Sequence, residues 1–143
     1  MGERFDIGKN WVVFAETKIP SLEPGLHSIV MWGDDRPGLD PITLLLEGKV
    51  LYGGVDNLQT KTREAVFVEL SETVHGQWTK IALVYRAERN VVQLYLDNVL
   101  VADSICSFKP SIDRPMPVRV GGAWGTAQRF RGQLRNLAIA NFD

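Results

Sequence analysis

Short apolar runs recur along the chain at intervals of about eight to twelve residues, with glycine, proline, aspartate or asparagine between them. Helix signals are nearly absent, and this combination is typical of an all-β sandwich. The seven prolines fall between the runs or at their edges, where a missing N–H does least harm. We expect strands near residues 11–18, 27–33, 42–47, 49–55, 64–70, 78–86, 91–97, 99–103, 117–121 and 129–141.

Turn residues and alternation refine this prediction. Asp97-Asn98 is expected to form a two-residue hairpin turn, because short polar side chains tolerate positive φ. A second hairpin is expected to turn at Glu47-Gly48. The apolar residues of the last strand do not keep one parity, which a β-bulge near Gly132 would reconcile.

Length and charge limit the function. A chain of 143 residues predicts one domain, residues 1–143, and a net charge of −1 with scattered basic residues argues against nucleic-acid binding. No apolar run approaches the length of a membrane span, and no signal peptide follows Met1. Cys106 is the only cysteine, so an intrachain disulfide and a paired-thiolate zinc site are excluded.

The second half of the chain carries a family resemblance. The segments are Trp78-Thr-Lys-Ile-Ala-Leu-Val-Tyr-Arg, Val91-Val-Gln-Leu-Tyr-Leu-Asp-Asn, Val118-Arg-Val-Gly-Gly and Arg129-Phe-Arg-Gly-Gln-Leu. In that order they resemble the laminin-G-like and pentraxin-like branch of the concanavalin A-like jelly rolls. The resemblance implies an antiparallel jelly-roll sandwich that binds glycans or protein surfaces and is not an enzyme.

The same resemblance points to an exposed sheet edge. Laminin-G-like chains usually have a further strand ahead of the segment that begins here at Phe5, beside the closing strand. Only four residues precede Phe5. We therefore expect the closing strand, near Leu137 and Ile139, to be an edge that a neighbouring chain covers, so that the protein self-associates.

Glycoside hydrolysis would need two carboxylates that face each other across a groove. The nearest candidates lie in Glu64-Ala-Val-Phe-Val-Glu-Leu-Ser-Glu72. Glu64 and Glu69 are separated by an odd number of positions, as are Glu69 and Glu72, and such residues point to opposite faces of a strand. His27 and His75 do not accompany a Gly-x-Ser-x-Gly nucleophile motif, so acyl-transfer chemistry has no support either.

Calcium is the one metal for which the chain offers candidates. Hard oxygen ligands would have to converge from loops at one rim of the sandwich. Asp34, Asp35, Asp40 and Asp56 lie in or beside such loops, and related domains bind calcium with loop acids of this kind. If a metal binds, we expect calcium at these four residues.

Aromatic residues indicate the ligand site. Trp11 and Trp78 open strands and match core or near-core positions, whereas Trp124 lies in a glycine-rich loop that can bury little of an indole. Flat aromatic faces with directed hydrogen bonds are what sugar rings require. We expect the binding residues to be Trp124, Trp32, Arg129 and Tyr52.

Two functions follow. The first is a lectin-like, non-catalytic module that binds a glycan or a protein partner through rim loops. The second is a structural role in an assembly, such as a virion decoration, cement or tail-associated protein. The first implies a domain cut from a larger extracellular protein, and the second a virion component.

Overall fold

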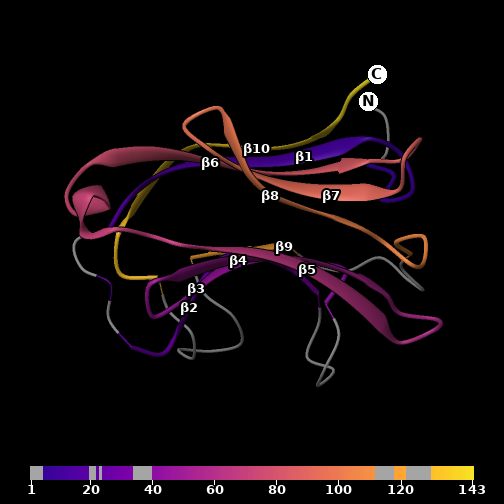
Figure 1. The fold of residues 1–143 in the computed structure, drawn as a ribbon, viewed down its shortest axis with the longest axis horizontal. Helices are drawn as coiled ribbons and strands as arrows, with labels where there is room; N and C mark the ends of the chain where they lie inside the picture. The colour runs from indigo at the N-terminus through magenta and orange to yellow at the C-terminus, as the bar shows by residue number, and fades with distance from the viewer. Residues whose placement is uncertain (1–4, 20–21, 23, 34–39, 112–117, 122–129) are drawn as a thin grey trace.

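The computed structural model describes residues 5–19, 22, 24–33, 40–111, 118–121 and 130–143. In these residues two antiparallel sheets face each other and form a β-sandwich (Figure 1). In spatial order, the first sheet contains β10 (Gln133–Asn141), β1 (Trp11–Lys18), β6 (Trp78–Arg86), β7 (Val91–Leu96) and β8 (Val99–Ile105). The second contains β5 (Thr62–Glu69), β4 (Val50–Asn57), β3 (Ile42–Glu47), β2 (Leu26–Trp32) and β9 (Val118–Val120). The predicted jelly-roll sandwich is confirmed.

Alternation along each strand builds the core between the sheets. In β1, Trp11, Val13 and Ala15 are fully buried, while the intervening residues face outward and are half-buried. The ring of Trp11 stacks on that of Tyr85 of β6, with centroids 5.9 Å apart. Trp78 is half-buried, and the Arg135 guanidinium lies 3.8 Å from the centre of its ring.

The turns confirm the local sequence rules. Asp97 and Asn98 have φ values of 47° and 68°, and they connect Leu96 directly to its partner Val99. Gly48, at φ 58°, occupies the β3–β4 turn. Both turns need left-handed backbone, which glycine and asparagine adopt at low cost.

The bulge in β10 does not lie where the sequence predicted it. Pairing with β1 is regular from Asn141 to Ala138, then shifts so that Arg135 pairs with Glu16. The irregularity therefore falls at Asn136 and Leu137, and Asn136 has φ 53°. Gly132 precedes the strand. At the bulge the Asn136 side chain donates to Glu16 in the neighbouring strand at 2.8 Å, a contact that helps to hold the irregularity there.

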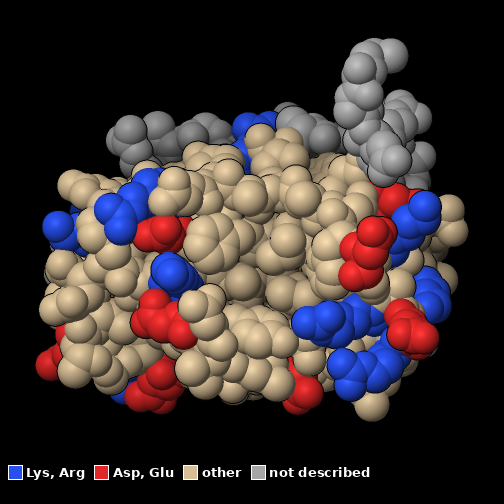
Figure 2. Space-filling model, turned by 90° about the horizontal axis from the view of Figure 1, so that it is seen from above, with Lys and Arg blue, Asp and Glu red and all other residues tan. Residues whose placement is uncertain are grey.

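The outer face of the first sheet carries no basic surface. Figure 2 looks onto this face and shows Lys and Arg mixed with Asp and Glu toward both ends, with an uncharged centre. Strand register places Phe14, Ala82 and Tyr95 side by side in this sheet. The described part of the chain contains no helix that could span a bilayer.

Candidate functional site

The predicted site residues fall into two groups. Trp124, Arg129, Asp34 and Asp35 lie outside the described residues. Trp32, Tyr52, Asp40 and Asp56 are described. Tyr52 and Asp56 are on the second sheet's outer face, the side turned away from the first sheet, and the backbone of Asp40 hydrogen-bonds to Asp56.

Trp32 packs toward the sandwich interior. Its ring lies 4.6 Å from the ring of Phe5, centroid to centroid, and it contacts the core cluster. The indole Nε1 is buried and has no hydrogen-bond partner among the described residues. Trp32 therefore contributes packing at this end of the sandwich, and its ring is not presented as a flat platform.

Tyr52 lies on the outer face of the second sheet. Its neighbours in β4, Leu51 and Gly53, are buried on the inner side. A Cβ atom on Gly54 would lie 3.1 Å from Tyr52 Cε1 and 3.2 Å from its hydroxyl oxygen, so the ring extends over this glycine. Burial raises the pKa of Tyr52, which keeps the phenol neutral and able to donate a hydrogen bond.

A buried ion pair lies at one end of this ring. Arg63 Nε is 2.8 Å from Asp56 Oδ1, and Arg63 Nη2 is 2.9 Å from Oδ2, so the guanidinium grips both carboxylate oxygens. The Asp56 side chain is 0% exposed and that of Arg63 is 40% exposed. Burial raises the pKa of the Asp56 carboxyl, and the hydrogen bonds and charge of Arg63 oppose that rise. Arg63 is thereby fixed at the surface with a planar cation beside an aromatic ring.

Phe67 is the aromatic residue that sequence reasoning missed. It pairs with Tyr52 across β4 and β5, and it is 65% exposed. A signal was available, because Ala65, Phe67 and Glu69 alternate with the inward Val66 and Val68. Tyr52, Phe67 and Arg63 form a continuous outer surface, which we call the β4–β5 face.

The described residues do not form a cluster of calcium ligands. Among them, no group of three His, Cys, Asp or Glu side chains could hold a metal ion. The carboxylate of Asp56 is taken up by Arg63 and also accepts a hydrogen bond from the backbone of Asp40. Calcium binding at Asp34, Asp35, Asp40 and Asp56 stays a prediction.

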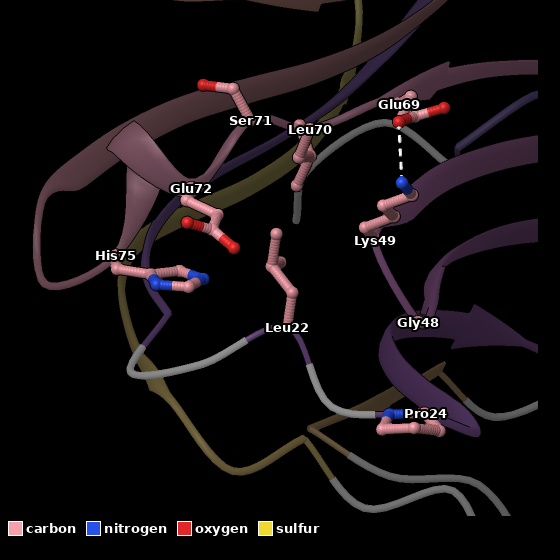
Figure 3. Close-up of a pocket in the computed structure, with 9 residues that line it drawn as sticks. All are labelled: Leu22, Pro24, Gly48, Lys49, Glu69, Leu70, Ser71, Glu72 and His75. Carbon is pink, nitrogen blue, oxygen red and sulfur yellow. Dashed lines mark ion pairs between the residues drawn. The ribbon is translucent and has the colours of Figure 1, made fainter.

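A pocket of about 630 Å³ opens at one end of the sandwich (Figure 3). Leu22, Leu70 and Pro24 supply its apolar lining. Glu72 and His75 lie together on one side, and the ion pair of Lys49 Nζ with Glu69 Oε1, at 2.8 Å, lies on the other. His75 caps the single turn of 3₁₀ helix η1 (Glu72–Val74), and its Nε2 atom is buried without a hydrogen-bond partner in the described part of the chain. The sequence had given His75 no role in binding.

The three glutamates considered for hydrolysis are arranged differently from one another. Glu64 faces the inner side, where the Ser104 hydroxyl donates to its carboxylate, whereas Glu69 faces outward and binds Lys49. Glu64 and Glu69 therefore point to opposite faces, as their odd spacing predicted. Glu69 and Glu72 are also an odd number of positions apart, but they line the same pocket, because β5 ends at Glu69.

A family model described as "Concanavalin A-like lectin/glucanases superfamily", of the laminin G type, matches residues 44–142. The chain belongs to this superfamily. The resemblance inferred from the sequence is therefore confirmed for this family. A comparison with curated proteins gave no match.

Solved structures show how widely this superfamily fold is shared. The chain is similar to the Ruminococcus gnavus sialidase module CBM40 bound to α2,3-sialyllactose, at 14% identity and TM-score 0.75, over 94% of this chain and 78% of that one. It is also similar to the Streptococcus pneumoniae sialidase NanB, at 10% identity and TM-score 0.76, over 93% and 22%.

A third similar structure is the receptor-binding domain of botulinum neurotoxin D, at 12% identity and TM-score 0.55, over 67% of this chain and 24% of that one. The chain thus spans less than a quarter of the sialidase and of the toxin fragment. At these identities the likeness shows the shared sandwich fold.

Proposed function

We propose that this superfamily member is a non-catalytic recognition module that binds a glycan across the β4–β5 face. The observation that carries the proposal is the pairing of Tyr52 with the 65%-exposed Phe67, beside an arginine that a buried carboxylate fixes in place. Sugar rings present apolar C–H faces and hydroxyls, and this surface offers aromatic rings and directed donors side by side.

The arrangement is already formed in the protein alone. Gly54 leaves room for the ring of Tyr52, and Asp56 holds Arg63 through two hydrogen bonds. A fixed cation and ring lose little conformational entropy when a ligand binds. Two similar structures support the choice of a binding role, since one is bound to sialyllactose and another is a receptor-binding domain.

An oligosaccharide array probed with the wild-type protein and with Phe67→Ala tests the proposal. We expect the wild type to bind a defined set of oligosaccharides and Phe67→Ala to lose that binding. Ile105→Ala is the matched control, because Ile105 is 75% exposed but lies in β8 of the other sheet. The proposal is wrong if no oligosaccharide binds, or if both variants bind like the wild type.

The edge strand β10 favours a second candidate function, a structural role in an assembly. Among described strands, β10 pairs only with β1, and its residues Leu137, Ala138 and Ala140 are exposed. An exposed edge offers unpaired N–H and C=O groups to another strand. Self-association through β10 would suit a component of a virion or a similar assembly.

A further inference from the structure

The pocket at His75 continues the β4–β5 face. Glu69 lies on the same side of β5 as Phe67, two residues further on, and it pairs with Val50 as Phe67 pairs with Tyr52. Two residues of strand span roughly 7 Å. A chain-like ligand that crosses Tyr52 and Phe67 therefore reaches the rim of the pocket at Glu69.

We propose that this pocket holds the end unit of the bound glycan, and that this unit is an uncharged sugar. The inference rests on the proposed function. It adds where the bound glycan ends and that its terminal sugar is uncharged. The volume of about 630 Å³ falls within the roughly 300–1,000 Å³ typical of small-ligand sites.

The polar groups of the pocket fit sugar hydroxyls. No described residue forms a hydrogen bond with the buried His75 Nε2, and Figure 3 shows the His75 ring and the Glu72 carboxylate turned toward the same space beside Leu22. A hydroxyl that donates to Glu72 can accept a hydrogen bond from His75 Nε2 when that nitrogen carries the proton. When it does not, a second hydroxyl of the sugar can donate to Nε2. Its binding would satisfy the buried nitrogen, which is otherwise costly to leave without a hydrogen bond.

The apolar lining of the pocket fits the C–H groups of a sugar. Leu22 and Leu70 lie between Glu72 and His75 on one side and Lys49 and Glu69 on the other (Figure 3), and Leu70 is only 4% exposed. The C–H groups of a pyranose can lie against these side chains while its hydroxyls reach Glu72 and His75. A site with both kinds of lining sets the orientation of the ring.

Charge decides between neutral and acidic end units. The described lining residues include two carboxylates, Glu69 and Glu72, and one lysine, Lys49, which is bound to Glu69 and interacts with the charge of Glu72 more weakly. A sugar carboxylate in the pocket would lie beside Glu72, and like charges at short range repel. An acidic end unit is therefore disfavoured.

The test uses an array of paired oligosaccharides that are identical except for a terminal sialic acid, with lactose and α2,3-sialyllactose as one pair. Wild type, Glu72→Gln, His75→Ala and the control Glu88→Gln, an exposed residue of the β6–β7 turn, are compared. We expect the wild type to bind the uncapped member of a pair about tenfold more tightly. Glu72→Gln should reduce that preference, because glutamine keeps the hydrogen bonds and removes the charge.

His75→Ala should weaken binding of uncapped members about tenfold, and Glu88→Gln should change nothing. If His75→Ala fails to fold, the loss of preference in Glu72→Gln decides the question. The inference is overturned if capped members bind equally or better, or if Phe67→Ala abolishes binding while both pocket variants bind like the wild type. If only Phe67→Ala abolishes binding, the proposed function stands and the inference about the pocket is wrong. If the wild type binds no oligosaccharide on the array, both the proposed function and this inference are wrong.

Discussion

Arg135 and Glu16 join β10 to β1 although 119 residues separate them in the sequence. Arg135 Nε and Nη2 lie 3.0 and 2.9 Å from Glu16 Oε2, and Asn136 Nδ2 donates to Oε1 at 2.8 Å. Because both residues of β10 reach the same carboxylate, Glu16 holds the strand at Asn136 in the bulge and at Arg135, the first paired residue next to it.

Replacing Glu16 should change the acid sensitivity of the fold. Hydrogen bonds from Asn136, then from Arg135, lower the pKa of Glu16. The stabilisation is therefore present above the usual glutamate pKa and is lost as pH falls through the lowered pKa. Glu16→Gln should be less stable than the wild type in urea unfolding at about pH 7, and the difference should be smaller at an acidic pH at which Glu16 takes up a proton. An equal gap at both pH values would contradict the assignment.

Replacing Arg63 should destabilise the protein more than replacing its partner Asp56. Arg63→Ala leaves a fully buried carboxylate unpaired and should cost about 3–5 kcal/mol of unfolding free energy. Asp56→Asn should cost less, because the half-exposed Arg63 can turn to water. Burial raises the pKa of Asp56, so the loss in Arg63→Ala should shrink as pH falls and the carboxyl takes up a proton. Denaturant titrations at two pH values check the order and the trend.

Cys106 should be unreactive in the folded protein. It is 5% exposed, and burial, with a smaller effect from the charge of Glu64, raises its pKa to about 11. The thiolate is the nucleophile, so little of the reactive form exists at neutral pH. Labelling by a thiol reagent should follow the rate of unfolding and become fast in denaturant. Rapid labelling of native protein would show that the thiol is accessible.

Substitutions at Asn98, in the β7–β8 turn, should differ in their effect on stability. The φ of Asn98 is 68°, which disfavours a residue with a Cβ atom and no local polar group, so Asn98→Ala should lose about 1 kcal/mol of stability. Asn98→Gly should stay within about 0.5 kcal/mol of the wild type. Thermal unfolding of the two variants measures the difference, and equal losses would mean that the backbone conformation is not limiting.

Strand β10 should mediate self-association. We expect the wild-type mass measured by light scattering to rise with concentration, and Leu137→Lys to remain monomeric, because lysine on an edge strand blocks pairing. Leu100→Lys is the control, since Leu100 is also exposed and lies in β8, the other edge of the same sheet. A wild type that stays monomeric throughout would rule out the assembly role through this edge.

The strands were predictable because each depends on local alternation and on turn residues. The bulge was not, because Asn136 is fixed by Glu16, which lies 120 residues away. From the local sequence, Gly132 was the expected position of the bulge, but the bulge lies at Asn136, beside the contact with Glu16.

The candidate site divides in the same way. Tyr52 was found as an aromatic residue in a strand, while the pocket was missed because it joins segments far apart in the sequence, from Leu22 to His75. Parity also failed for Glu72, because the rule holds only inside a strand and β5 ends three residues earlier.

The first and last described segments meet at one point of the sandwich. Asp6 N–H donates to Asn141 Oδ1 at 2.8 Å, and Phe142 N–H donates to the Asn10 carbonyl at 3.1 Å (Figure 1). A domain whose ends are adjacent can be inserted into a surface loop of a host protein without spreading that loop apart. The same closure means that joining the ends and opening the chain at the exposed Asp97-Asn98 turn should give a permuted protein with this fold.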